Sequence, residues 1–409
     1  MRWLILTQYF PPEIGASQVR LAALAKELER LGHDVEVVTS LPNYPTGRTF
    51  PGYRGRIYLR EKWDGVSVHR VWLYPSMGSG FRRLANYLSF SVMALFPLLQ
   101  IRRPDVVFVE SPPLFLGLSG VLAAWRWRIP MILNVADLWP DSVHEFGVMR
   151  DGSMLWLAER LERWSYQRAT FISTVTEGIQ KALVERKNVP HHKVLFLPNG
   201  VDTNLFRPRP PDSQLARQLD LEGKRVALYA GTHGHAHGLG VALHAVKLLE
   251  NAGIVFVFIG GGSEKPKLQE MAAEMSLGNV YFLDPAPPEY VARLYSLATI
   301  ALSTLRKSSV AEETRPAKVL PAMASGKPVV YSGSGEGARL IEDTRAGLVV
   351  PPEDPKALAD AILTLAYNPA LADELGRNGR KYVEEKLTWS ALVKDWLRQL
   401  EAHEGVLRK

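Results

Sequence analysis

The chain alternates short apolar runs with longer segments whose apolar residues recur at helical spacing. Residues 2–10 read RWLILTQYF and form an apolar, strand-like run. Residues 18–31 then carry apolar side chains at the helical period, and residues 34–40 form the next strand-like run. This strand–loop–helix–strand order predicts a parallel sheet with crossover helices. Further strands are expected at residues 66–72, 105–110, 131–135, 170–175 and 194–197, so the amino-terminal half is predicted to be a doubly wound α/β domain.

The same pattern starts again after a segment rich in Pro, Asn and Gly, PNGVDTNLFRPRPP at residues 198–211. Strands are expected at residues 225–230, 254–259, 280–283, 300–303 and 328–331, with helices at 239–251, 265–275, 290–298 and 318–325. Residues 355–400 are expected to be almost wholly helical. Two similar α/β halves joined by a linker predict two domains, with a ligand between the carboxyl ends of their sheets.

Length and composition agree with this division and exclude some chemistry. A chain of 409 residues exceeds what one hydrophobic core usually supports. The absence of cysteine excludes disulfides, thiolate catalysis and Cys-based zinc sites, and it suits a reducing compartment. Because Met1 leads directly into a strand-like run, we expect no signal peptide.

The positive charge is concentrated in the first half. Residues 1–205 hold 24 Lys and Arg against 18 Asp and Glu, whereas the remainder holds 25 against 24. A basic half indicates an anionic partner, such as nucleic acid, a phospholipid surface or a lipid phosphate. No zinc-finger spacing, RNP-type strand or Lys-rich tail is present. We therefore predict a membrane surface as the partner, and no nucleic acid.

Two apolar segments of the first half differ from the core pattern. Residues 81–100 are very apolar from Leu84 onward and have arginines at both ends. They are interpreted as an interfacial amphipathic helix, as a buried helix of the first domain or, against the presence of Asn86 and Pro97, as a membrane span. Residues 114–127 end in Trp-Arg-Trp-Arg, a composition typical of an interfacial belt but also compatible with a core.

The most informative segment is residues 312–330, EETRPAKVLPAMASGKPVV. It places Glu313, Arg315 and Lys318 just ahead of a small-residue helix, at the expected carboxyl edge of a strand. A nucleotide-linked substrate offers a diphosphate to cations and a ribose to carboxylates. The alternative interpretation is a solvated charge cluster at the start of a helix.

Other loops offer backbone N–H groups or a carboxylate. Gly15 and Ala16 lie between the first strand and the first helix, where a phosphate can approach the backbone, although simple turn chemistry explains them equally. Asp137 follows a strand beside a Trp-Pro turn, either to hold a sugar hydroxyl or to close an Asx turn. The Gly-rich loops at residues 260–263 (Gly261, Gly262 and Ser263) and 333–337 (with Glu336) resemble nucleotide-cradling turns.

The loop that begins at Gly231 holds three histidines at alternate positions, His233, His235 and His237. Such spacing can indicate a metal site, but the flanking glycines do not fix a ligand set. We predict no metal here, and contacts from His235 and His237 to a phosphate or sugar instead.

Together these residues resemble the retaining glycosyltransferases of the GT-B fold, glycosyltransferase family 4. The matching pieces run from Tyr9 to Trp389 and include YFPPEIGA, ELERLGHDVEVVT, the LPNG-VD-xx-F junction, IGGGSE, MASGKPVV and AGLVVPPEDPKALADAI. LPNYPTG, WDGVSVHRV, DLWPDS and Pro316-Ala317-Lys318 resemble the bacterial surface-polysaccharide branch, which includes N-acetyl-L-fucosamine transferases.

The resemblance implies two Rossmann-like domains that face each other across a cleft. Residues 1–200 would form the acceptor-binding, membrane-facing domain, residues 201–385 the nucleotide-sugar domain, and residues 386–409 a helix that packs back on the first. It implies a hexosyltransferase (EC 2.4) with a UDP-sugar as donor and no cofactor. Lys318 and Arg315, with the Gly15 loop, would neutralise the diphosphate, so that no metal is needed. Glu313 would face the donor sugar, and Gly231 and Pro316 would border the donor.

The sequence departs from the family pattern in three ways. Pro321 replaces the second Glu of the E-x7-E motif, which usually binds ribose. The family's Arg and Lys after the first strand of the second domain fall on Thr232 and His237, and the catalytic-loop His falls on Ala136. The resemblance therefore shifts phosphate binding onto Lys318 and Arg315.

The favoured prediction is a peripheral enzyme at the cytoplasmic face of the cell membrane. It would move a sugar, an N-acetylated amino or deoxy sugar, to a polyprenyl-diphosphate-linked saccharide in surface-polysaccharide or O-antigen assembly. The alternatives are transfer to a soluble acceptor, a nucleotide-sugar epimerase, and a degenerate non-catalytic subunit.

Overall fold

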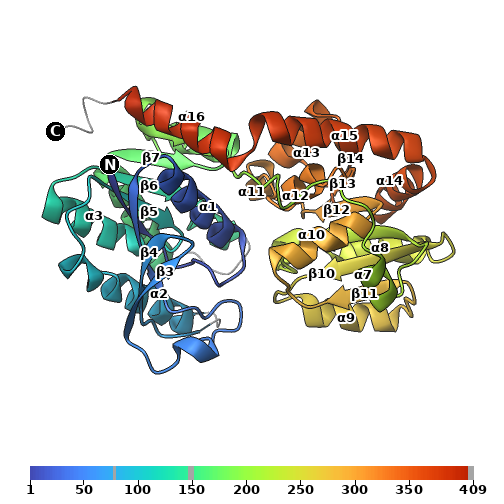
Figure 1. The fold of residues 1–409 in the computed structure, drawn as a ribbon, viewed down its shortest axis with the longest axis horizontal. Coiled ribbons are helices and arrows are strands. Elements are labelled where there is room, and N and C mark those ends of the chain that lie inside the picture. Colours follow the sequence, from blue (N-terminus) through green and yellow to red (C-terminus); the bar gives the residue numbers. More distant parts are fainter. Residues whose placement is uncertain (77–79, 146–151, 404–409) are drawn as a thin grey trace. The chain divides into compact units, whose positions relative to one another are not determined.

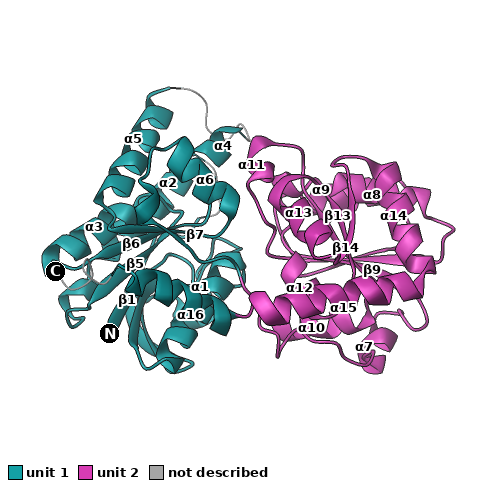
Figure 2. Ribbon diagram, turned by 90° about the horizontal axis from the view of Figure 1, so that it is seen from above, with its two compact units in different colours: residues 1–199, 389–409 teal, residues 200–388 magenta. Residues whose placement is uncertain are grey.

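The computed structural model describes residues 1–76, 80–145 and 152–403. The chain divides into two compact units (Figure 2). Unit 1 comprises residues 1–199 and the helix α16 (Trp389–Glu401), and unit 2 comprises residues 200–388. The carboxyl-terminal helix thus belongs to the unit in which the chain begins, and the chain passes between the units twice.

Unit 1 is built on an eight-stranded sheet in the order β3-β4-β2-β1-β5-β6-β7-β8. Only the edge pair β3–β4 is antiparallel. The strands are β1 (Arg2–Leu6), β2 (Asp34–Ser40), β3 (Tyr58–Trp63), β4 (Val66–Val71), β5 (Val106–Ser111), β6 (Met131–Val135), β7 (Phe171–Thr174) and β8 (Val194–Phe196). From β1 the chain builds the sheet first on one side and then, from β5 onward, on the other. The doubly wound first half is therefore confirmed.

The edge strand β3 was not expected from the sequence. Its residues, YLREKW, alternate only weakly between apolar and polar and stay partly exposed in the sheet. Asp64 and Gly65, with φ of 45° and 94°, form the tight turn into β4. An exposed edge strand has little apolar surface to bury, so its sequence carries only a weak strand signal.

Helices cover both faces of the unit 1 sheet (Figure 1). They are α1 (Ala16–Arg30), α2 (Phe81–Met93), α3 (Leu116–Trp127), α4 (Asp141–Glu145), α5 (Ser153–Arg168), α6 (Glu177–Glu185) and α16. The last helix is held by its aromatic residue: Trp396 is fully buried, with its ring 5.6 Å from Trp3 and 5.7 Å from Phe108. Burying so large a side chain against the first strands fixes α16 to unit 1.

Unit 2 has a six-stranded, all-parallel sheet in the order β11-β10-β9-β12-β13-β14. The strands are β9 (Arg225–Ala230), β10 (Ile254–Ile259), β11 (Val280–Leu283), β12 (Ile300–Thr304), β13 (Val329–Ser332) and β14 (Gly347–Val350). The helices are α7 (Ser213–Gln218), α8 (Gly240–Leu248), α9 (Lys265–Glu274), α10 (Pro288–Leu297), α11 (Ser309–Glu312), α12 (Val319–Ala324), α13 (Gly335–Asp343), α14 (Pro355–Tyr367) and α15 (Pro369–Lys386). The order reverses between β9 and β12, which in open parallel sheets marks the ligand-binding edge.

The small residues of MASGKPVV serve close packing. Ala322 and Ala324 of α12 are almost fully buried. A Cβ on Gly376 of α15 would lie 2.2 Å from the Gly326 carbonyl oxygen. These contacts explain why α12, which begins next to Lys318, is firmly placed.

One expected loop is a helix. Residues 333–337 were predicted to be a Gly-rich turn, but α13 begins at Gly335. Gly335 has a φ of +72°, and a Cβ there would lie 2.4 Å from the Glu312 backbone. The glycines therefore allow α13 to pack against α11, and the expected loop is confined to residues 333 and 334.

Candidate functional site

Two glycine-containing loops of unit 2 pack backbone to backbone beside the switch point. The Gly231 loop follows β9, and residues 260–263 follow β10. The His233 N–H donates to the Gly261 carbonyl at 2.8 Å, and a Cβ on Gly260 would lie 1.9 Å from the Gly231 carbonyl oxygen. A Cβ on Gly262 would clash with the His233 backbone in the same way. Glycine is therefore required for the approach of these loops, which puts Gly231, Gly261 and Gly262 on one wall, with Ser263 exposed next to it.

Lys318 reaches this wall from the start of α12. Its aliphatic stem lies against Gly231, 3.1 Å from where a Cβ would be. Its Nζ donates to the Tyr229 hydroxyl at 2.7 Å and lies within hydrogen-bond distance of His237 Nδ1, at 3.0 Å. Tyr229 in turn donates to the Thr232 carbonyl at 2.7 Å. Burial lowers the pKa of Lys318 to about 7.

The partners of Lys318 are neutral groups. Among the residues that the structure describes, no carboxylate oxygen lies within 4.0 Å of its Nζ. A buried ammonium group usually pairs with a carboxylate, because burial without one is costly. Within the described residues the Lys318 ammonium group therefore has only neutral hydrogen-bond partners.

The three histidines of this loop lie in different surroundings. His233 is fully buried beside the rings of Tyr229, Phe258 and Phe282, and burial lowers its pKa to about 4. Burial, followed by Lys318, lowers the pKa of His237, whereas His235 is exposed. Among the described residues, no group of three or more His, Cys, Asp or Glu side chains could hold a metal ion. His233 is an aromatic-packed core residue, not a surface ligand.

The remaining predicted residues of unit 2 lie on the loops after β12 and β13. Pro316 borders Gly337, where a Cβ would lie 3.0 Å from the proline ring. Arg315 and Glu336, which the sequence analysis gave separate roles, form a close pair: Arg315 Nε lies 3.9 Å from Glu336 Oε1, and both side chains are nearly buried. Glu313 ends α11 and is partly exposed. The structure thus brings Glu313, Arg315, Pro316, Lys318 and Glu336 to one edge of the unit 2 sheet.

The predicted residues of unit 1 lie after β1 and β6. Gly15 and Ala16 begin α1 at the carboxyl end of β1. Asp137 follows β6, and its carboxylate accepts from the Ser142 hydroxyl at 3.0 Å. Burial raises the pKa of Asp137. This contact, at the first turn of α4, gives Asp137 a local structural role, while its part in chemistry stays a prediction.

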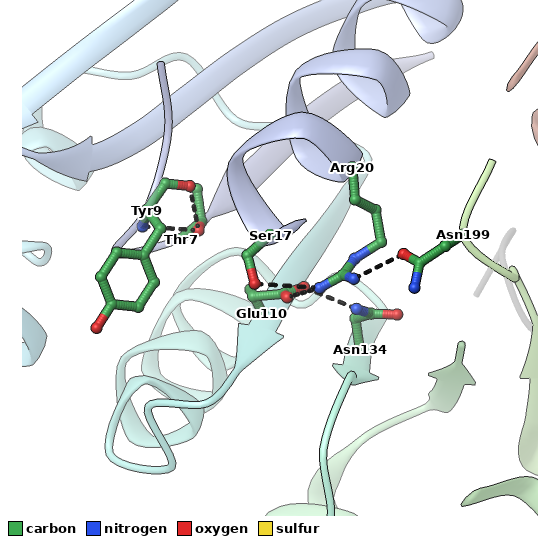
Figure 3. A network of polar contacts seen from close by, with 7 residues as sticks. All are labelled: Thr7, Tyr9, Ser17, Arg20, Glu110, Asn134 and Asn199. Carbon is green, nitrogen blue, oxygen red and sulfur yellow. Dashed lines mark hydrogen bonds and ion pairs between the residues drawn. The ribbon is translucent and has the colours of Figure 1, made fainter. Parts of the chain in front are cut away.

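Sequence reasoning missed a buried polar network next to the Gly15 loop (Figure 3). Arg20 of α1 forms an ion pair with Glu110 at the end of β5, and their side chains are 3% and 0% exposed. Arg20 also donates to Asn199 at 2.9 Å, and Asn134 of β6 donates to Glu110 at 2.7 Å. The available signal was an arginine on the apolar face of a helix and a glutamate inside an apolar strand.

A second buried carboxylate ties two loops together. Glu13 follows β1 and accepts from the Asn43 N–H at 2.6 Å and the Tyr44 N–H at 2.8 Å. These two residues belong to the LPNYPTG segment after β2. Burial raises the pKa of Glu13 to about 7, against the effect of the two backbone donors. The carboxylate thereby fixes two loops at the same edge of the unit 1 sheet.

Unit 1 also exposes large apolar side chains on the neighbouring helices α2, α3 and α5, which we call the apolar face. Helix α3 packs between α2 and α5. Leu99, in the turn after α2 (η2, Pro97–Leu99), is 71% exposed, and Trp125 of α3 is 78% exposed. The apolar face comprises Phe81, Leu88, Val92, Phe96, Leu99, Leu118, Leu122, Trp125, Met154, Trp156 and Leu157.

Residues 81–100 contribute side chains both to the core and to the apolar face. Asn86 and Phe90 of α2 are buried in the core, while Val92 on the same helix is 66% exposed. The segment is therefore partly core and partly surface. None of the helices in the described residues has both the length and the hydropathy needed to cross a bilayer.

Comparison with known proteins adds to this geometry. Residues 15–200 match the family described as "Glycosyl transferase 4-like domain", and residues 212–382 match "Glycosyl transferases group 1". A curated relative in Escherichia coli K12, the putative colanic acid biosynthesis glycosyl transferase WcaI, is 26% identical over 98% of this chain and 100% of its own.

Solved structures share the fold. HepE of Anabaena, in complex with UDP and glucose, superposes with a TM-score of 0.76 at 17% identity, over 98% of this chain and 100% of its own. WaaG, a glycosyltransferase involved in lipopolysaccharide biosynthesis, does so with a TM-score of 0.69 at 17% identity, over 97% and 98%.

Proposed function

This chain is a family 4 glycosyltransferase with the GT-B fold, and we propose that it moves a sugar from a UDP-sugar to a polyprenyl-diphosphate-linked saccharide in bacterial surface-polysaccharide assembly. The observation that carries the donor part is Lys318, a partly buried cation with neutral partners at the switch point of unit 2. A diphosphate is the anion that such a position suits. The UDP in the structure of HepE supports the choice of nucleotide.

We assign the donor contacts as follows. Lys318 meets the diphosphate and stabilises the negative charge that develops on it as the sugar leaves. The backbone N–H groups around Gly231, Gly261 and Gly262 approach the same phosphates closely, which side chains at these positions would prevent. Glu313 is placed to bind a hydroxyl of the donor sugar. Ser263, His235, His237 and Pro316 border the nucleotide.

The Arg315–Glu336 pair changes one sequence-based role. Because Glu336 lies beside the Arg315 guanidinium, Arg315 is in part neutralised by it. We propose that Arg315 orients Glu336 toward the ribose hydroxyls, in place of the family glutamate that Pro321 lacks. Lys318 is then the principal cation of the donor site.

Retention of configuration follows from front-face attack in this proposal. The acceptor hydroxyl gives its proton to the departing phosphate, and the cationic side chain takes the place of a metal ion. Asp137 of unit 1 is assigned to the acceptor hydroxyls, and Gly15 and Ala16 to phosphate oxygens, as the family resemblance implies. The donor sugar is assigned to the N-acetylated amino or deoxy sugars on the same ground.

The apolar face supports a lipid-linked acceptor. Three neighbouring helices of unit 1 present aromatic and aliphatic side chains to solvent, and exposed arginines such as Arg82, Arg126 and Arg163 lie among them. Apolar side chains enter the acyl boundary, while each Arg near an anionic surface adds about 1 kcal/mol of attraction. We propose peripheral binding at the cytoplasmic face of the cell membrane, where a polyprenyl-diphosphate substrate resides.

The test uses the purified chain, a panel of UDP-sugars and a synthetic polyprenyl-diphosphate saccharide. We expect UDP release that requires the acceptor, which separates transfer from hydrolysis. Transfer to a water-soluble saccharide at the same rate would contradict the lipid-acceptor part. Failure of every UDP-sugar, with another nucleotide-sugar accepted, would contradict the donor assignment.

A further inference from the structure

We propose that binding of the donor diphosphate takes up a proton at the contact between Lys318 and His237, and that Tyr229 and His237 position the Lys318 amine for this exchange. This inference rests on the proposed function, in which Lys318 meets the diphosphate. It adds a regulatory property of the same site: donor affinity that depends on pH near neutrality.

The hydrogen bonds fix which partner donates. The Tyr229 hydroxyl donates to the Thr232 carbonyl at 2.7 Å, so toward Lys318 it accepts. When Lys318 is an ammonium group, His237 Nδ1, 3.0 Å from Nζ, accepts from it, and the ring proton of the neutral imidazole is then on Nε2. The ammonium form therefore uses two N–H donors in this arrangement.

Both protonation states of the amine can supply these two N–H donors. An ammonium group has three N–H donors, and a neutral amine has two with a lone pair. The observed contacts thus use both N–H donors of the neutral amine, whereas the ammonium keeps a third donor for a ligand. The geometry accommodates either protonation state, and the third hydrogen is the one that a phosphate oxygen would receive.

The surroundings favour the neutral state without a ligand. The titratable and charged groups that face this contact are Tyr229 of β9, His233 and His237 of its loop, Lys265 of α9, and Arg306 after β12, which packs on Gly238. Lys265 already pairs with Asp284 at 2.8 Å. Within the described residues no carboxylate oxygen lies within ion-pair distance of Lys318 Nζ, so these groups add only neutral or positive neighbours.

A bound diphosphate favours the charged form of Lys318 instead. Burial lowers the pKa of Lys318 to about 7 in the chain alone, and a nearby anion raises it again. The affinity for the diphosphate is therefore highest below pH 7, where the amine already carries its proton, and it falls as pH rises above 7. Above that value one proton accompanies each diphosphate, so the affinity falls up to about tenfold per pH unit.

The experiment is isothermal titration of the full chain with UDP-glucose at pH 6.0, 7.0 and 8.0, in buffers of different ionisation enthalpy. UDP-glucose is chosen because its diphosphate diester does not titrate in this range, unlike a terminal phosphate. We expect the slope of heat against buffer enthalpy to give close to one proton taken up at pH 8.0 and a much smaller value at pH 6.0. The expected loss of affinity from pH 7.0 to 8.0 is about fivefold to tenfold.

Two variants locate the proton. Lys318→Arg carries a guanidinium that stays charged, so any binding it retains is expected to show no proton uptake. Lys224→Gln changes an exposed lysine at the start of β9 and is expected to behave like the unchanged protein. In His237→Gln the amide oxygen still accepts from Lys318, so uptake at pH 8.0 should persist. Its loss there would move the proton to the imidazole, and that result would overturn the positioning role of His237.

The failures are distinguishable. UDP-glucose and UDP that both fail to bind would overturn the proposed donor site. UDP-glucose that binds with heats independent of the buffer at pH 8.0 would leave the donor site standing and overturn the proton uptake. Uptake that persists unchanged in Lys318→Arg would assign the proton to a different group.

Discussion

Each unit holds a cation near the carboxyl edge of its sheet, but Arg20 is buried beside a carboxylate, whereas Lys318 is partly buried among neutral groups. Arg20 in unit 1 has Glu110, Asn199 and Ser17, and its charge is balanced within the chain (Figure 3). Lys318 in unit 2 has a tyrosine hydroxyl and an imidazole. A buried charge whose partners are complete holds a structure together, whereas one with neutral partners is available to a ligand. The contrast marks Arg20 as a structural residue and agrees with the ligand-binding role that we propose for Lys318.

The units also differ in surface. Unit 1 exposes the apolar face, whereas among the described residues of unit 2 only Leu248 and Tyr367 are large, apolar and well exposed. Most of the excess positive charge lies in the first half as well. The proposed membrane contact therefore lies on unit 1, and the proposed nucleotide contact on unit 2.

Removing the Arg20 side chain should have the largest effect on stability. Arg20→Ala leaves Glu110 buried and unpaired, so we expect the free energy of unfolding to fall by about 3–5 kcal/mol. Urea denaturation followed by circular dichroism measures it. Replacing both ions, as in Arg20→Met with Glu110→Leu, should restore a large part of the loss. A loss under 1 kcal/mol in Arg20→Ala would contradict the structural role.

Removing the unbalanced cation should spare the fold and damage activity. Lys318→Ala is expected to lower kcat/KM by about 100-fold to 1000-fold, the effect of deleting one charge-stabilising donor. Its unfolding free energy should stay near that of the unchanged chain, because the lost group is one whose burial opposes folding. Lys224→Ala provides the matched control. Activity within threefold of normal would remove Lys318 from the mechanism.

The surface contrast is tested with vesicles that contain anionic lipid. Leu99→Ser together with Trp125→Ser should weaken sedimentation with vesicles by about tenfold or more, since each removes one to two kcal/mol of apolar burial. Leu248→Ser is the control, because that leucine is 60% exposed on unit 2. An equal effect of Leu248→Ser would show that binding is not confined to the apolar face.

The smallest effect is expected at Glu13. Its pKa of about 7 in the folded chain lies above the ordinary value for glutamate, so its contribution to stability is present at low pH and is lost as pH rises through 7. The unfolding free energy should fall with pH by up to about 1.4 kcal/mol per unit between pH 5 and 7. Glu13→Gln should flatten this part of the profile. A profile that is unchanged by the substitution would place the titration elsewhere.

The alternating pattern was sufficient to predict both sheets, because buried parallel strands leave clear apolar runs. It failed at β3, whose edge position leaves its residues exposed, and at α13, where a glycine that serves packing resembled a loop. The segment around Lys318 could be identified from its charges. Its partner Tyr229, 89 positions away, could not, since that contact depends on how β9 and α12 pack. The Arg20 network was missed for the same reason, because it joins residues from separate strands and helices.

The central claim is that Lys318 binds the diphosphate of a nucleotide-sugar in unit 2. A crystal structure of the chain with UDP tests it most directly: we predict a phosphate oxygen within hydrogen-bond distance of Lys318 Nζ, beside the Gly231 backbone. UDP bound elsewhere, with Lys318 still held only by Tyr229 and His237, would contradict it.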